Sequence, residues 1–295
     1  MKFSWCNQGP TMTVTRFLQQ QGVSKRLLKQ LKYYGQVWLN GYPCRLIDLL
    51  PVNAEIKIKL PAESGDPLAA ISLQPLILLA ETPHWLVVNK PAGLASVPGP
   101  QTGSDTLVSR VRGYLLQSGA ENVVPHLVSR LDYGTSGVVL VAKHSFAHSR
   151  LASATTIREK NYLAVVAGMI HASHGMITLP LGQRPTQPAG IIDLAGKPAT
   201  TEFWREGYLP QLEATVLKLK LHSGRRHQIR IHLQAVGHPL LGDNLYGGPL
   251  DRGISRQALH AQQLIFTDPF TQQLQTITAP LPTDLAQLFK STSSQ

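Results

Sequence analysis

The fold of this chain is organised around one polar turn and the apolar run that follows it. The turn reads Ser129-Arg130-Leu131-Asp132-Tyr133-Gly134-Thr135-Ser136-Gly137. The apolar run is Val138-Val139-Leu140-Val141-Ala142. Asp, Gly and Ser at this density are typical of tight turns, and a short β-branched run that is apolar on both faces is typical of a buried strand. The pattern therefore predicts that Asp132 lies on a rigid loop at the mouth of a buried strand, a common place for a catalytic group.

Two roles are open for Asp132. An Asp in a tight turn often caps that turn with its own side chain, which would make its role structural. The run Arg-Leu-Asp-x-x-Thr-Ser-Gly, however, resembles the signature of the RluA-type pseudouridine synthases, in which the Asp is the catalytic residue. That family usually has His before the Arg, whereas this chain has Ser129. The resemblance implies a catalytic Asp132. Arg130, two residues away, is placed either to pair with Asp132 or to point at a ligand. In RNA it would fill the gap left when the target nucleotide is flipped out of its stack, since an enzyme must expose a base before it acts on it.

The composition favours a globular protein with a polyanionic partner. The chain has 295 residues, of which 43% are hydrophobic, and it carries 28 Lys and Arg against 17 Asp and Glu. A formal net charge of +11 favours nucleic acid before membrane as the partner. The two cysteines make no disulfide framework, and no apolar run reaches the length of a membrane span. We therefore expect a soluble cytoplasmic protein that makes no membrane contact, with a monomer as the default state.

The first 62 residues have the pattern of a small separate unit. Apolar periodicity predicts a helix at 13–21 and a second helix that begins after Ser24, a good N-cap. The dipeptide Asn40-Gly41 predicts a hairpin turn, and the alternation at 55–60 predicts a half-buried strand.

The second of these helices carries lysines on one face. Lys25, Lys29 and Lys32 are spaced four and three residues apart, which is either a solvated surface or a binding surface. Together with the hairpin, the helix resembles the alpha-L RNA-binding domain, the S-four-like type. The resemblance implies that these lysines contact RNA phosphates without reading the base sequence.

The rest of the chain divides into a linker, a main domain and a tail. Residues 63–75 carry Ser, Gly and Pro with little periodicity, so we predict a linker there, followed by a main domain at 76–290 and a tail at 291–295. In the main domain the patterns predict strands at 86–93, 138–142, 160–168 and 217–221. They predict helices at 106–116, 146–156, 225–237 and 282–289.

A tyrosine follows a lysine in the strand predicted at 160–168. From spacing alone Tyr162 is a half-buried strand aromatic with its hydroxyl at the surface. The pseudouridine synthase family has Lys-x-Tyr-x-Ala at this place, and the resemblance implies that Tyr162 stacks on the target base and is a candidate proton acceptor. A phenol has a flat face for uracil and an oxygen for a proton.

The run after the strand at 217–221 is rich in basic residues. Periodicity predicts one helix from about Arg225 to Gly237, in which Arg226 and Arg230 share a face. Its apolar stripe would consist of Ile229, Leu233 and Val236.

The sequence Gly-Arg-x-His-Gln-Ile-Arg in this run is close to a second signature of the same family. The family usually has Thr or Ser where this chain has Arg226. The resemblance implies that Arg230 forms a salt bridge with the catalytic Asp132. The departure at Arg226 adds positive charge, and we expect Arg225 and Arg226 to contact RNA. A guanidinium can hold a carboxylate ionised and oriented, although Arg–carboxylate pairs also occur in ordinary cores.

Three histidines in this run raise the question of a metal. His222, His227 and His232 are five residues apart, so neither a helix nor a strand brings all three together. No His-Glu-x-x-His and no Cys pair supports a site, and we therefore expect no metal.

Later motifs also match the family. The run from Gly237 to Gly247 matches Gly-x-Pro-x-x-Gly-Asp-x-x-Tyr-Gly, and 259–261 and 279–282 match its closing segments. On their own these are turns, with Asp243 bonding backbone amides. We keep that structural interpretation for them.

The ordered set of motifs covers residues 76–290 and implies the pseudouridine synthase fold. That fold is α/β of the mixed α+β kind, with a largely antiparallel sheet and an active cleft across it. The expected function is isomerisation of uridine to pseudouridine in structured RNA, with rRNA favoured over tRNA. We expect Asp132, Tyr162 and Arg230 to be the catalytic residues. No cofactor is expected, because nothing is oxidised and no phosphate is transferred.

Two rival functions stay open. A hydrolase of N-glycosidic bonds would share the Asp, but such enzymes usually need a second carboxylate to activate water, and none stands out near these motifs. A catalytically silent RNA-binding protein is the other, and it would be expected to have lost the Asp or the Tyr, whereas both are present.

Overall fold

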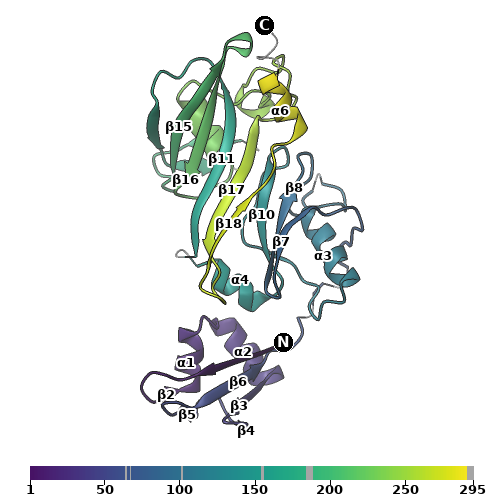
Figure 1. The fold of residues 1–295 in the computed structure, drawn as a ribbon, viewed down its shortest axis with the longest axis vertical. Helices are drawn as coiled ribbons and strands as arrows, with labels where there is room; N and C mark the ends of the chain where they lie inside the picture. Colours follow the sequence, from purple (N-terminus) through teal and green to yellow (C-terminus); the bar gives the residue numbers. More distant parts are fainter. Residues whose placement is uncertain (64, 67, 101, 154–155, 184–188, 291–295) are drawn as a thin grey trace.

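Two β-sheets form the frame of the molecule. The computed structural model describes residues 1–290 except 64, 67, 101, 154–155 and 184–188, so the predicted tail at 291–295 lies outside the described residues. A four-stranded sheet lies in the N-terminal part and a ten-stranded sheet in the remainder (Figure 1). In the part of the chain that the structure describes, no helix is long and apolar enough to cross a membrane.

The N-terminal unit has the elements that its sequence predicts. Ser24 caps the second helix by accepting a hydrogen bond from the amide of Leu27. Asn40 and Gly41 both have positive φ, as a two-residue hairpin turn requires. The sheet has the order β1 (Lys2–Cys6), β6 (Glu55–Lys59), β3 (Gln36–Leu39), β4 (Tyr42–Pro43). A further pair and the two helices complete it: β2 (Met12–Thr13), β5 (Leu49–Leu50), α1 (Val14–Gln20) and α2 (Lys25–Tyr34).

The large sheet is mixed and mostly antiparallel, which confirms the predicted fold class. Along the sheet the order is β12 (His174–Thr178), β15 (Thr200–Leu209), β16 (Ala214–Leu221), β11 (Ile157–Ala167), β17 (Leu259–Thr267), β10 (Ser136–Ala142), β8 (Trp85–Lys90) and β7 (Leu78–Glu81). Two short strands join it at the side, β18 (Leu274–Thr278) on β17 and β9 (His126–Leu127) on β10.

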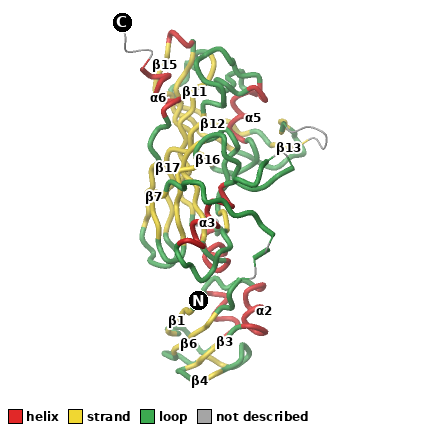
Figure 2. Tube along the Cα trace, turned by 90° about the vertical axis from the view of Figure 1, so that its right-hand side faces the viewer, coloured by secondary structure: helices red, strands yellow, loops and turns green. Residues whose placement is uncertain are grey.

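Helices cover both faces of this sheet. On one face α3 (Leu107–Gln117) and α5 (Gln228–Ala235) pack on the largest core, and Figure 2 shows both helices on the same side of the strands. On the other face lie α4 (Ser145–Leu151) and α6 (Thr283–Lys290) with two further cores. Short elements between these are β13 (Leu181–Gln183), β14 (Gly190–Ile192), and the 3₁₀ turns η1 (Pro210–Leu212) and η2 (Asn244–Tyr246).

The turn before β10 is held by the C-terminal part of the chain. All seven residues of β10 are buried, and its start runs parallel to the start of β17, with Gly137 opposite Ala261. A Cβ on Gly137, whose φ is 117°, would collide with the carbonyl oxygen of Ala261. Gln257 donates to Thr135 at 3.1 Å, so residues more than 120 positions away fix the conformation of this turn.

The N-terminal unit packs directly on the main domain. Phe146 of α4 belongs to the core of the N-terminal unit, and Ser149 of the same helix donates to the carbonyl of Gly22. The described residues of the predicted linker 63–75 contain no helix or strand, yet Ser72 is buried and hydrogen-bonds Asp105. A boundary at residue 62 stays a proposal.

Two predicted helices differ from the observed ones. The helix expected at 146–156 ends at Leu151, and residues 154–155 lie outside the described ones. The helix expected from Arg225 begins only at Gln228, because His227 takes a left-handed backbone conformation, with φ 54° and ψ 18°, as its N-cap. The prediction that Arg226 shares a helical face with Arg230 is therefore wrong. Val236 is exposed as well, so the buried part of the predicted stripe consists of Ile229 and Leu233.

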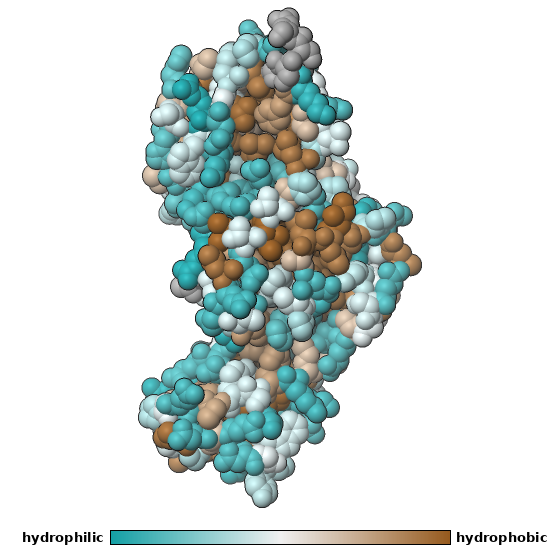
Figure 3. Space-filling model, viewed as in Figure 1, coloured by the Kyte–Doolittle hydropathy of each residue, from teal (hydrophilic) through white to brown (hydrophobic). Residues whose placement is uncertain are grey.

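The surface over β15 and β16 is mostly hydrophilic (Figure 3). Lys218 is exposed and lies over the ring of Trp204, and Lys220 pairs with Glu159 at 2.7 Å. The strict alternation at 217–221 correctly predicted a strand with one wet face.

Candidate active site

The motifs meet in one cleft of about 620 Å³ on the side of the sheet that carries α3 and α5. Its walls come from the turn before β10, from β11 and from the segment that leads into α5. The predicted site residues that line it are Arg130, Asp132, Tyr162, Arg225, Arg226 and Arg230. Lys25, Lys29 and Lys32 of α2 are exposed and do not line this cleft.

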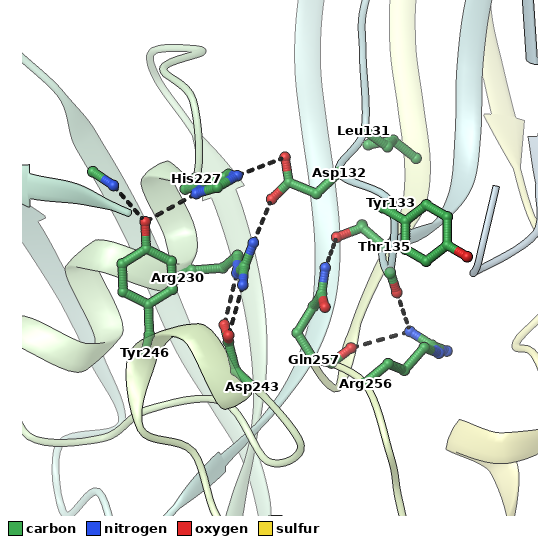
Figure 4. Close-up of polar contacts among 12 residues, drawn as sticks. Leu131, Asp132, Tyr133, Thr135, His227, Arg230, Asp243, Tyr246, Arg256 and Gln257 are labelled. Atoms are coloured by element: carbon green, nitrogen blue, oxygen red, sulfur yellow. Dashed lines mark hydrogen bonds and ion pairs between the residues drawn. The ribbon is translucent and has the colours of Figure 1, made fainter. Parts of the chain in front are cut away.

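The main chain around Asp132 is fixed from several sides. Ser96 donates to the carbonyl of Leu131 at 2.6 Å and accepts from its amide at 3.1 Å. The amide of Thr135 donates to the carbonyl of Asp132 at 3.0 Å. The carboxylate of Asp132 contacts Arg230 and His227 across the cleft rather than the amides of its own turn, among the residues described. The turn thus presents this carboxylate to the cleft (Figure 4).

A buried lysine supports the same turn from below. Lys90 is fully buried, and its ammonium donates to the carbonyls of Pro91, Leu94 and Tyr133. Burial lowers the pKa of Lys90 to about 7, while the charge of Asp132 acts in the opposite direction. The strand predicted at 86–93 gave no sign of this role, because a strand pattern does not show that a lysine points inward.

Arg230 joins two carboxylates. Its Nε and Nη2 donate to the two oxygens of Asp243 at 2.7 and 2.6 Å, and Nη1 lies 3.4 Å from Oδ2 of Asp132. The predicted contact with Asp132 is therefore present, but the stronger, bidentate partner is Asp243. Asp243 is almost completely buried, and its side chain bonds this arginine rather than backbone amides, so the turn-capping interpretation of Asp243 is wrong.

His227 lies on the other side of Asp132. Its Nε2 is 3.8 Å from Oδ1 of Asp132, and its Nδ1 is 2.9 Å from the hydroxyl of Tyr246. The same hydroxyl accepts a hydrogen bond from the amide of Gly190 at 2.9 Å (Figure 4). Burial lowers the pKa of His227, and the positive charges of Arg230 and Arg226 act in the same direction. The sequence contained a signal for these two residues, since His227 and Tyr246 both lie inside motifs that match the family. The spacing of the residues, however, did not predict that they contact each other or Asp132.

Tyr162 forms part of the floor of the cleft. It lies on β11, packs in the main core and is only 9% exposed, so the expected half-buried position with a surface hydroxyl is wrong. Burial first, and the negative charge of Asp132 second, raise the pKa of its phenol far above the ordinary value. The ring is therefore neutral at physiological pH.

Several cations surround this floor. Arg130 and Arg226 are exposed at the rim, and Arg225 donates to the carbonyl of Pro198 at 3.2 Å. Lys160, two residues before Tyr162 on β11, lines the cleft as well, and burial lowers its pKa. Lys160 belongs to the Lys-x-Tyr motif, but it was not among the predicted site residues.

The three histidines of the basic run have separate partners. His222 pairs with Glu202, His227 with Tyr246, and His232 with Thr201 and the carbonyl of Leu179. Among the described residues no group of three or more His, Cys, Asp or Glu side chains is arranged to hold a metal ion.

Sequence comparisons identify the family. The profile of the family described as RNA pseudouridylate synthase matches residues 84–235. The RNA pseudouridine synthase YjbO of Bacillus subtilis is 37% identical over 95% of this chain and 99% of its own length. The ribosomal large subunit pseudouridine synthase D of Xylella fastidiosa is 37% identical over 72% of this chain and 68% of its own length.

Solved structures show the same fold at lower identity. Human RNA Pseudouridylate Synthase Domain Containing 1 matches with a TM-score of 0.56 and 24% identity, over 79% of this chain and 98% of that one. Human RNA Pseudouridylate Synthase Domain Containing 4 has a TM-score of 0.59 and 21% identity, over 74% and 93%. On its sequence relatives, the chain belongs to the RluA-type family of RNA pseudouridine synthases, which are isomerases that convert uridine to pseudouridine.

Proposed function

We propose that the chain isomerises specific uridines of structured RNA, ribosomal RNA rather than tRNA, with Asp132 as the catalytic residue and without a cofactor. The observation that carries this proposal is the cleft in which the carboxylate of Asp132 faces Arg230 and which Tyr162 also lines. The choice of rRNA rests on the relatives that are named ribosomal large subunit pseudouridine synthases.

The reaction needs no external reactant. The bond from N1 of uracil to C1′ breaks, the base turns, and a bond from C5 to C1′ forms; C5 loses a proton and N1 gains one. Asp132 acts as the nucleophile that frees the base, either at C6 of uracil or at C1′ of the ribose. Arg230 keeps this carboxylate ionised and oriented, with Asp243 holding the guanidinium in place.

The buried phenol favours one of the two roles expected for Tyr162. A strongly raised pKa makes a phenol a poor proton acceptor, because a base must be competent near the working pH. A neutral ring on the floor of the cleft is well suited to stacking on uracil. We therefore assign Tyr162 to stacking, and the C5 proton to another group.

The cations around the cleft and on α2 are proposed to hold the RNA. Arg130, exposed beside Asp132, would take the place of the flipped nucleotide, while Arg225 and Arg226 contact phosphates at the rim. Lys25, Lys29 and Lys32 would add affinity that does not depend on base sequence.

A second carboxylate does stand in this site, contrary to the expectation from the sequence. Asp243 shares Arg230 with Asp132, which reopens the hydrolase as a rival. Both oxygens of Asp243 accept hydrogen bonds from Arg230, and the residue is 1% exposed. It is therefore badly placed to activate a water molecule, and the synthase stays the better proposal.

Tritium release from RNA labelled at C5 of uridine tests the proposal. Total rRNA and tRNA are assayed separately with the wild type, with Asp132→Asn and with Asp251→Asn, a matched change at an exposed aspartate. We expect release from rRNA by the wild type and Asp251→Asn, and none by Asp132→Asn. Free uracil would support the hydrolase instead. Tight binding of both RNAs without release would support a silent RNA-binding protein.

A further inference from the structure

The two oxygens of Asp132 face different donors. Oδ2 lies 3.4 Å from Nη1 of Arg230, and Oδ1 lies 3.8 Å from Nε2 of His227. The arginine is a cation held by Asp243, so its role in orienting the carboxylate is easily explained. The histidine contact is wider than a hydrogen bond, and its value depends on whether Nε2 carries a proton.

The hydrogen bonds of Tyr246 answer that question. Its hydroxyl accepts the amide proton of Gly190 and has one further lone pair and one proton to place. The other hydrogen-bond partner of this oxygen within the described residues is Nδ1 of His227, at 2.9 Å. If the second lone pair accepted from Nδ1–H, the hydroxyl proton would have no acceptor among the described residues. The arrangement in which every proton has an acceptor therefore has the hydroxyl donate to Nδ1, and a neutral imidazole then carries its proton on Nε2, the atom that faces Asp132.

The surroundings of His227 favour the neutral ring. Burial and the guanidinium groups of Arg230 and Arg226 disfavour a charged imidazole, while Asp132 and Asp243 favour it. Burial is the largest influence, so the pKa of His227 lies below its usual value. At neutral pH the ring therefore offers one N–H donor without adding a positive charge beside Asp132.

Tyr246 contacts both of the residues that face Asp132, His227 and Arg230. Its hydroxyl bonds His227, whose ring stands nearly perpendicular to the phenol ring at a centroid distance of 5.8 Å. The guanidinium carbon of Arg230 lies 4.8 Å from the centroid of the same phenol ring. One tyrosine thus contacts both residues that face Asp132, as Figure 4 shows.

We propose that His227 and Tyr246 are positioning residues: Tyr246 fixes His227 as the Nε2–H tautomer, and this neutral donor orients Oδ1 of Asp132. The inference rests on the proposed function, because it gives Asp132 the catalytic role. In the substrate complex the 3.8 Å contact closes to a hydrogen bond, as wide catalytic contacts of free enzymes often do. A donor without charge restricts rotation of the carboxylate while leaving its nucleophilicity largely intact.

Nitrogen NMR of the full chain labelled with ¹⁵N-histidine tests the tautomer without any activity. The signals lost in His227→Gln identify the ring among the 11 histidines. At pH 7.5 we expect a protonated Nε2 and an unprotonated Nδ1, and we expect Tyr246→Phe to shift these signals toward a mixture of tautomers. A wild-type ring protonated at Nδ1, or signals unchanged in Tyr246→Phe, would overturn the proposal even if the enzyme proves to be a synthase.

Single-turnover kinetics on the RNA substrate test the orienting role. The amide of Gln reaches the position of Nε2, whereas the shorter Asn does not, and Asn tolerates the left-handed backbone at φ 54°. We expect His227→Asn to lower the rate of the chemical step about ten- to a hundredfold with little change in RNA affinity, the scale of one hydrogen bond to a charged group. His227→Gln should lose clearly less, and His171→Gln, at an exposed histidine, should lose nothing. Equal losses in Gln and Asn, or losses that follow the folded fraction, would show that His227 is only structural.

Discussion

Breaking the buried pair of Arg230 and Asp243 should have an asymmetric cost. Their side chains are 9% and 1% exposed and share two short hydrogen bonds. Removing one partner of such a pair costs about 3–5 kcal/mol, because a charge is left buried without compensation. Asp243→Leu leaves Arg230 with Asp132 at 3.4 Å, so we expect the lower end, about 3 kcal/mol. Arg230→Met leaves Asp243 with no other side-chain partner among the described residues, so we expect the upper end, about 5 kcal/mol.

Urea unfolding of the two single variants and the double variant measures this coupling. The double variant buries no charge at this position and should lose at least about 3 kcal/mol less than the sum of the single losses. The exposed pair of Arg45 and Asp48 is the control, and the same cycle there should give less than about 1 kcal/mol of coupling. Additive losses within about 0.5 kcal/mol at the buried pair would refute the reasoning. A smaller loss in Arg230→Met than in Asp243→Leu would refute the assigned asymmetry.

Three further predictions concern the buried lysine, the stacking tyrosine and the lysines of α2. Lys90 has a pKa of about 7 in the folded protein, so between about pH 7 and 10 its side chain holds a proton in the unfolded chain but not in the folded one. The free energy of unfolding should therefore rise with pH in this range, with a contribution from Lys90 of up to about 1.4 kcal/mol per pH unit. Lys90→Met should abolish this contribution when urea unfolding is measured at several pH values. A wild type and variant with the same slope would mean that the three carbonyls keep the ammonium charged. For the stacking role, Tyr162→Phe should keep the rate of tritium release within about tenfold, whereas Tyr162→Ala should lower it much more; equal losses would point to the hydroxyl instead. Changing Lys25, Lys29 and Lys32 to Gln should reduce the slope of log affinity for RNA against log salt by about 2–3 without altering the chemical step, and an unchanged slope would place the RNA elsewhere.

Local features of the fold were predictable because they are encoded by neighbouring residues. The cap at Ser24, the turn at Asn40-Gly41 and the buried strand after Asp132 each depend on backbone preferences within a few positions. The resemblance of the motifs to the family likewise predicted that Asp132, Tyr162 and Arg230 act together, and all three line one cleft. The order of the motifs along the chain was sufficient to predict that these three residues share a site, because each motif is recognised from its own local sequence.

The wrong predictions share a different cause. One residue with positive φ, His227, delays the start of α5 and removes Arg226 from the helix, and periodicity cannot reveal a single backbone angle. The partner of Asp243 is decided by how η2 and α5 pack, so its turn residues pointed to capping instead. Phe146 was predicted only as the start of a helix, and the packed molecule shows that its side chain fills the core of the N-terminal unit.

The parallel pairing of β10 with β17 has a consequence for the order of events during synthesis. The loop of Asp132 takes its shape from Gln257, Arg256 and Ala261, which the ribosome adds more than 120 residues later. A nascent chain that ends before this segment carries the carboxylate on a loop without its partner strand. We therefore expect the cleft around Asp132 to take its final shape only after synthesis has reached the last eighth of the chain.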